Sequence, residues 1–114
     1  MTSAPVVVLS GAKVREGMEG KEAEVTAELN AILHQIPGYI STKEYVAADG
    51  ETLSVFTFES DDALVRWRDE ASHVAYQRVT DDYYESFWVQ AAQVYRSYVW
   101  RDGQRTDTHS PMDS

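Results

Sequence analysis

One stretch of the chain concentrates the side chains that could do chemistry. From Arg66 to Trp88 it holds two of the three tryptophans, three tyrosines, a histidine and three arginines. Histidine changes its charge near neutral pH and can act as a base or as a metal ligand. Tryptophan and tyrosine offer flat apolar rings that each carry one polar group. This combination predicts either a densely packed core or a pocket for a flat aromatic molecule.

Trp67 and His73 are the predicted catalytic residues, with Trp67 as a wall of the pocket and His73 as its base. They stand six residues apart, and a continuous helix would place them about 120° apart around its axis. They can face one pocket only if the helix breaks between them, where Ser72 could cap a new turn. The helix dipole would then keep His73 neutral and able to accept a proton or bind iron. The alternatives are core packing for Trp67 and a capping or solvent-facing position for His73.

Five more residues are predicted to bind the substrate. Tyr76, Tyr83, Tyr84 and Trp88 could close the mouth of the pocket. Interface packing is the alternative, and it is favoured for Trp88 because this residue lies in a predicted strand. Arg78 could anchor an anionic group, although a surface ion pair is the simpler interpretation.

Motifs and composition limit the cofactors and partners. The sequence has no HExxH, no paired-histidine spacing and no calcium-binding loop, so we predict no metal site. Lys and Arg number 10 against 19 Asp and Glu, and this net charge of −9 repels nucleic acid. There is no cysteine, which favours a cytoplasmic location. The longest apolar run, 5–9, is too short to span a membrane, and no secretory signal is visible.

Six predicted elements must position these residues. Alternating β-branched residues indicate strands, and apolar residues at helical spacing indicate helices. We expect strands at 6–14, 39–47, 51–58 and 86–100, and helices at 21–35 and from 61 to about 80, the second with a break. Pro37-Gly38 ends the first helix, Asp49-Gly50 marks a hairpin turn, and Ser60 is the expected N-cap of the second helix.

The order β-α-β-β-α-β predicts an α+β, ferredoxin-like domain over residues 1–100, with a disordered C-terminal tail at 101–114. Both helices would cover one face of the four-stranded antiparallel sheet. The last strand is apolar on both of its faces, and no element remains to cover the second face of the sheet. We therefore expect a homodimer that packs sheet against sheet, with the long final strand crossing towards the partner.

The chain also resembles the antibiotic biosynthesis monooxygenase domain family of the dimeric α/β barrel superfamily, over residues 6–100. The resemblance is carried by Phe58, Ser60, Ala63 and Trp67 in the pattern Phe-x-Ser-x-x-Ala-x-x-x-Trp, followed by His73. The helix-to-strand transition at Pro37-Gly38 adds to it. This resemblance implies the dimeric barrel fold, but the family carries several activities on that fold.

The resemblance implies a cofactor-independent monooxygenase that acts on an aromatic, polyketide-like or quinol substrate with O₂. The family's oxygenases of this kind also use asparagines, one in the first loop and one on the tryptophan-bearing helix. Here Met18 and Ala63 stand at those places, and the chain's single asparagine is Asn30. The alternatives are a non-catalytic or cyclase-like accessory protein that binds a small molecule and, third, a haem-binding or haem-degrading protein with His73 as the ligand.

Overall fold

The computed structural model describes the backbone of residues 4–78 and 83–109, and the side chains of all of these except 71–78 and 109. The elements are β1 (Val6–Val14), α1 (Glu19–Leu33), β2 (Tyr39–Val46), β3 (Thr52–Phe58), α2 (Asp61–Arg78), β4 (Tyr84–Gln93), β5 (Ser97–Arg101) and β6 (Gln104–His109). The first six follow the order β-α-β-β-α-β, so the predicted ferredoxin-like α+β fold is confirmed.

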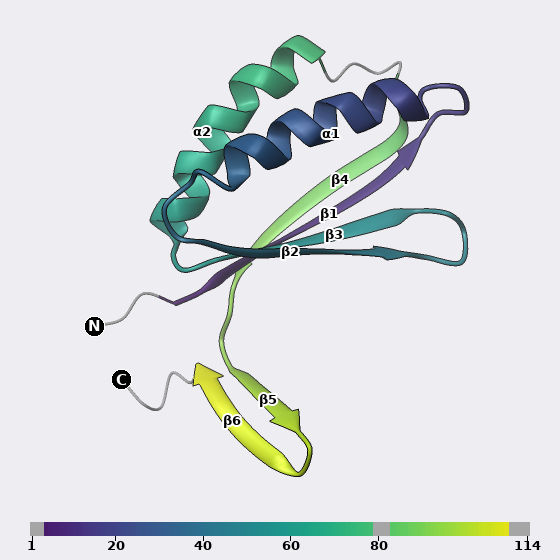
Figure 1. The fold of residues 1–114 in the computed structure, drawn as a ribbon. Coiled ribbons are helices and arrows are strands. Elements are labelled where there is room, and N and C mark those ends of the chain that lie inside the picture. Colours follow the sequence, from purple (N-terminus) through teal and green to yellow (C-terminus); the bar gives the residue numbers. More distant parts are fainter. Residues whose placement is uncertain (1–3, 79–82, 110–114) are drawn as a thin grey trace.

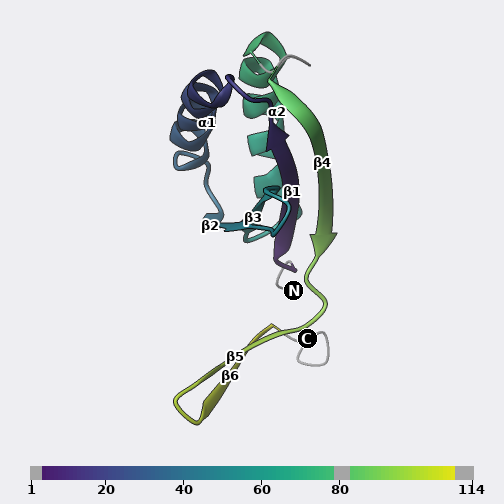
Figure 2. The ribbon, with the colours of Figure 1, turned by 90° about the vertical axis from the view of Figure 1, so that its right-hand side faces the viewer.

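The four long strands form an antiparallel sheet in the order β2-β3-β1-β4. Both helices lie on one face of this sheet, and α1 packs beside α2 (Figures 1 and 2). The N-cap predicted for α2 is present, because the Ser60 hydroxyl accepts a hydrogen bond from the Ala63 backbone N–H at 3.4 Å. The β2–β3 turn also forms at the predicted place, where Gly50 has φ of 92°.

The register of the sheet assigns each side chain to one of two faces, since residues opposite one another share a face. Val8 pairs with Phe56 and Ala91, and Ser10 pairs with Ser54 and Val89. These residues face the helices. The intervening positions face away from the helices, and we call this side the far face.

The core is concentrated at one end of the helix-covered face. Val8, Leu33, Phe58 and Ala63 are buried and contact one another, and Trp67 packs against them. Phe58 is fully buried, which contributes about 1.5–3 kcal/mol for a side chain of this size. The two helices are therefore fixed to the sheet where β3 leads into α2.

Two predictions about regular structure at the C-terminal end of the chain were wrong. The expected last strand at 86–100 is interrupted, because Gln93 pairs with Val6 at the start of β1 and the chain then runs out of a partner strand. The expected disordered tail contains β6, which pairs with β5 through a two-residue turn at Asp102-Gly103. Both turn residues have positive φ, 52° and 81°, as a tight hairpin turn requires. This β5–β6 hairpin projects away from the main sheet (Figures 1 and 2).

The predicted break in the second helix is also absent, since α2 runs without interruption from Asp61 to Arg78. The break was the condition for Trp67 and His73 to share a face. On the continuous helix the two positions lie about 120° apart around the axis.

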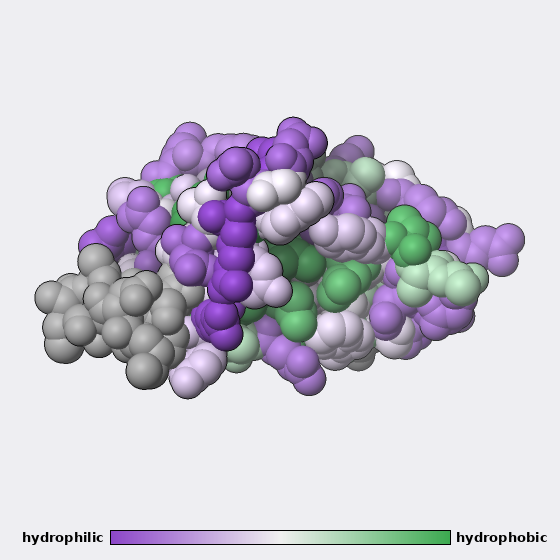
Figure 3. All heavy atoms as spheres, turned by 90° about the horizontal axis from the view of Figure 1, so that it is seen from below, coloured by the Kyte–Doolittle hydropathy of each residue, from purple (hydrophilic) through white to green (hydrophobic). Residues whose placement is uncertain are grey.

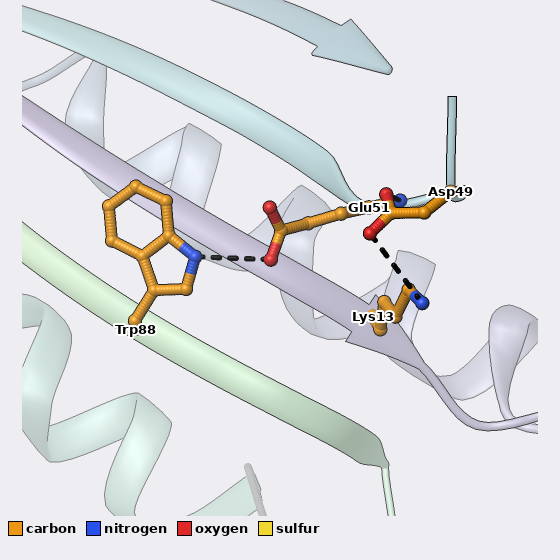
Figure 4. A network of polar contacts seen from close by, with 4 residues as sticks. All are labelled: Lys13, Asp49, Glu51 and Trp88. Atoms are coloured by element: carbon orange, nitrogen blue, oxygen red, sulfur yellow. Dashed lines mark hydrogen bonds and ion pairs between the residues drawn. The ribbon is translucent and has the colours of Figure 1, made fainter. Parts of the chain in front are cut away.

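The far face carries apolar side chains, and no helix or strand among the described residues packs over them (Figure 3). By register it includes Leu9, Leu53, Val55 and Trp88. Trp88 lies flat over Gly11, where a Cβ atom would come within 2.1 Å of the indole nitrogen. The same nitrogen donates a hydrogen bond to the Glu51 carboxylate at 3.1 Å (Figure 4). The missing side chain at Gly11 therefore makes room for the indole on the sheet.

This contact predicts opposite effects of two glycine-to-alanine substitutions. Gly11→Ala should displace the indole and lower the free energy of unfolding by about 1–2 kcal/mol. Gly20→Ala in α1, where an added Cβ meets nothing within 4 Å, should raise it by about 0.5–1 kcal/mol. Urea unfolding followed by circular dichroism measures both. If Gly11→Ala costs as much in a Trp88→Ala background, the indole is not the cause.

Candidate functional site

A cavity of about 550 Å³ lies between α1 and the helix-facing side of the sheet. Its floor is made of alternate residues of β1 together with their cross-strand neighbours in β3 and β4. At the middle of the floor stand Ser10, Ala12 and Ser54, and on the α1 side stand Ala23 and Ala27. These side chains are too short to close the space between helix and sheet, which is why the cavity exists.

The register also defines two opposite ends of the cavity. Val8 and Phe56 lie at the inner end beside the core, together with Trp67 from α2. Val14 and Tyr84 lie at the opposite end, where β1 pairs with the start of β4. We refer to these two ends as the inner end and the mouth.

Trp67 forms the wall of the inner end and part of the core at the same time. Its ring lies 5.0 Å from that of Phe56 and 5.6 Å from that of Phe58, measured between centroids. Its indole nitrogen is buried and has no hydrogen-bond partner among the described residues. A buried N–H without a partner costs about 1–3 kcal/mol. A hydrogen-bond acceptor that reaches this nitrogen would remove that cost.

Polar groups gather at the mouth. Glu22 on α1 accepts a hydrogen bond from the Thr26 hydroxyl at 2.6 Å, and both residues line the cavity. Tyr84 is half-buried on the opposite side. Burial raises the pKa of the Tyr84 phenol above its usual value, and the negative charge of Glu22 raises it further. Tyr84 therefore stays protonated at neutral pH and is able to donate a hydrogen bond.

The structure brings together only part of the predicted site. Trp67 and Tyr84 line the cavity, at its inner end and its mouth. Tyr83 does not line it, and Trp88 lies on the far face instead of at the mouth, because its strand position has the opposite parity to Phe87 and Val89. The other three predicted site residues are His73, Tyr76 and Arg78. Their side chains lie outside the part of the chain that the structure describes.

Several cavity residues were not predicted. Asn30, Glu22 and Thr26 face the cavity from α1, and Glu44 faces it from β2. The spacing of the α1 residues follows the three- and four-residue period of one helix face, which is a usable signal. The alanines on this face follow one stripe of the helix, but that stripe was not assigned to a cavity. Its polar members were overlooked for the same reason.

Among the described residues, no three His, Asp or Glu side chains are grouped so that they could hold a metal ion. In the same part of the chain, neither helix has both the length and the hydropathy needed to cross a bilayer.

Comparison of the sequence with family models and with curated proteins gives no match. Solved structures do match. A protein from Shewanella oneidensis has a TM-score of 0.68 at 19% identity, over 81% of this chain and 92% of its own. A variant of SnoaB from Streptomyces nogalater, described as a cofactor-independent oxygenase, has a TM-score of 0.67 at 12% identity, over 83% of this chain and 97% of its own.

A third similar structure is a protein from Bordetella bronchiseptica. Its description as an antibiotic biosynthesis monooxygenase is itself an inference. It has a TM-score of 0.61 at 14% identity, over 81% of this chain and 98% of its own. Identities this low establish the fold and leave the activity to be argued from the site. The chain has the same ferredoxin-like α+β fold as these structures, as the resemblance implied.

Proposed function

We propose that this protein is a cofactor-independent monooxygenase that oxidises an electron-rich aromatic molecule, polyketide-like or quinol-like, with O₂. The observation that carries the proposal is the unpaired indole N–H of Trp67, buried at the inner end of a 550 Å³ cavity with aromatic walls. A flat substrate with an oxygen at its edge would stack between these walls and accept this hydrogen bond. The fold shared with a cofactor-independent oxygenase supports the same proposal.

The chemistry needs no cofactor when the substrate has an acidic C–H bond beside its aromatic system. A base removes the proton, and the resulting carbanion passes one electron to O₂. The substrate radical and superoxide combine to a peroxide anion, which takes up the proton to give a hydroperoxide, and the hydroperoxide then loses water. The sum is R₂CH₂ + O₂ → R₂C=O + H₂O. The protein's task is to take the proton, stabilise the anion and exclude bulk water.

The residues of the cavity divide this task by position. The Trp67 N–H would donate to the substrate oxygen that gains negative charge, since donors aimed at developing charge give the largest electrostatic effect. Tyr84, which stays protonated, would donate at the mouth. Glu22, which lines the cavity beside Tyr84, is the first candidate for the proton acceptor. His73, the acceptor proposed from the sequence, is the second, because the continuous α2 places it about 120° from Trp67 around the axis. Tyr76 and Arg78 remain proposed substrate contacts, and a cytoplasmic location remains a prediction.

Trp67→Phe tests the proposed role of the indole N–H, because it keeps an aromatic ring and removes the donor. We expect kcat/KM for oxygen uptake with an anthrone or quinol substrate to fall about 10²-fold. The free energy of unfolding should stay within about 1 kcal/mol, since the lost ring area opposes the relief of an unpaired buried N–H. An oxygen electrode and urea unfolding measure the two quantities. His73→Ala and Glu22→Gln, assayed in parallel, separate the two candidate bases.

Three outcomes would contradict the oxygenase proposal. Unchanged oxygen uptake in Trp67→Phe removes the indole from the mechanism. Thermal stabilisation by aromatic ligands without oxygen uptake favours the non-catalytic or cyclase-like binding protein. A Soret band on mixing with hemin that disappears in His73→Ala favours the haem-binding alternative.

Filling the cavity tests whether it is the substrate site. Ser54 lies in the middle of the floor, level with Ser10. In Ser54→Phe the new ring should occupy the cavity and abolish binding of a naphthol probe and oxygen uptake, while the melting temperature stays the same or rises. Ser54→Ala is the matched control and should leave binding intact. Retained activity in Ser54→Phe would place the substrate elsewhere.

We also propose that the protein is a homodimer joined through the far face. By register, Leu9, Leu53 and Val55 form an apolar centre there, and Trp88 beside them is 36% exposed. Figure 3 shows apolar side chains gathered on this face. An uncovered apolar face of this kind marks an interaction surface. A second copy presents the same face, as a twofold-symmetric interface requires.

Val55→Glu tests this interface by placing a charge at its centre. We expect the parent chain to elute as a dimer in size-exclusion chromatography with light scattering, and the variant as a monomer. Ala31→Glu adds the same charge at an exposed position on α1 and should leave the dimer intact. A monomeric parent chain, or a dimer that tolerates Val55→Glu, would contradict the proposed interface.

A further inference from the structure

The charges that line the cavity are all of one sign. Glu22 lines it from α1 and Glu44 from β2, and no lysine or arginine is among its described lining residues. The whole chain has the same sign, with a net charge of −9. A negatively charged ligand would therefore enter a negative field and find no described cation to pair with.

The two carboxylates lie at different levels of the cavity wall. Glu44 pairs across the sheet with Ser54, which pairs with Ser10 at the middle of the floor. Glu22 lies nearer the mouth, where its charge reaches Tyr84. Its carboxylate is oriented by the Thr26 hydroxyl at 2.6 Å. A ligand that fills the cavity between the mouth and Trp67 therefore has both carboxylates in the wall around it.

The raised pKa of Tyr84 shows how an anion would be affected by the surroundings of the cavity. Its phenol is disfavoured as an anion first by burial and then by the charge of Glu22. An anionic group on a ligand at the same place would meet the same two penalties. A phenolic hydroxyl on a ligand would instead donate a hydrogen bond to a carboxylate, which is stronger than a bond between neutral groups.

We propose that the cavity binds uncharged aromatic molecules with phenolic hydroxyl groups and excludes those that carry a carboxylate, and that Glu22 and Glu44 determine this selectivity. The inference rests on the proposed function only in taking the cavity as the substrate site. It also fits the chemistry, because a neutral substrate that gives its proton to a base inside the cavity leaves the total charge there unchanged. A substrate that arrives as an anion adds a negative charge.

The test compares two probes of the same shape, 2,6-dihydroxynaphthalene and 6-hydroxy-2-naphthoate, by isothermal titration calorimetry without oxygen. We expect the parent chain to bind the neutral probe at least about tenfold more tightly, with a smaller ratio at high salt. Glu44→Gln and Glu22→Gln should each reduce the ratio, and the double variant should bring it close to one. Glu24→Gln removes the same charge from an exposed position on α1 outside the cavity, and should leave the ratio unchanged.

Equal affinity for the two probes, no binding of the neutral probe, or a ratio that Glu24→Gln changes as much as Glu44→Gln would overturn the inference. Because oxygen is absent, this result is independent of the oxygenase proposal. Selective binding without any oxygen uptake in air would leave the inference standing and remove the oxygenase. Oxygen uptake at equal kcat/KM with neutral and carboxylated substrates would support the oxygenase proposal and overturn the inferred selectivity.

Discussion

The site depends on one packing constraint, the different sizes of the side chains at the two ends of the helix–sheet interface. At one end Phe58 and Leu33 are completely enclosed and hold both helices against the sheet. Further along, Ser10, Ser54 and Ala27 face one another and cannot fill the same separation. Protein interiors are otherwise packed about as densely as organic crystals. The cavity therefore exists because the side chains here are too small to fill the space. The well-packed end keeps the helices and the sheet at a fixed distance.

Strand parity then divides the remaining roles between the two faces. On β4, Phe87 and Val89 face the cavity, whereas Trp88 between them faces the opposite way and lies on Gly11. One strand thus contributes to the candidate site and to the surface that we propose as the dimer interface. A shift of one residue in the β1–β4 register would exchange the two sets of side chains, so the same hydrogen bonds maintain both.

The fold could be predicted from the sequence to a large extent, because its strongest signals are local. The strand at Val6–Val14 and the N-cap at Ser60 were predicted correctly. The Asp102-Gly103 turn was missed, although the same dipeptide was used at positions 49 and 50, because the residues after it are polar and did not indicate a strand. The site was harder to predict. Trp67 was predicted from its aromatic segment and supported by the family resemblance. Glu22, Asn30 and Glu44 were missed, since cavity residues are defined by the distance between a helix and a sheet. No local pattern encodes that distance.

The three tryptophans occupy three different parts of the molecule. Trp67 lines the inner end of the cavity, Trp88 lies on the far face, and Trp100 stands 66% exposed on the β5–β6 hairpin. Indole emission shifts to longer wavelength as the ring becomes hydrated. The emission maximum of each tryptophan therefore depends on the part of the molecule in which it lies. Chains that retain a single tryptophan would report separately on cavity occupancy, on subunit association and on the surroundings of the β5–β6 hairpin. The native tryptophans can therefore serve as fluorescent probes of ligand binding and of subunit association.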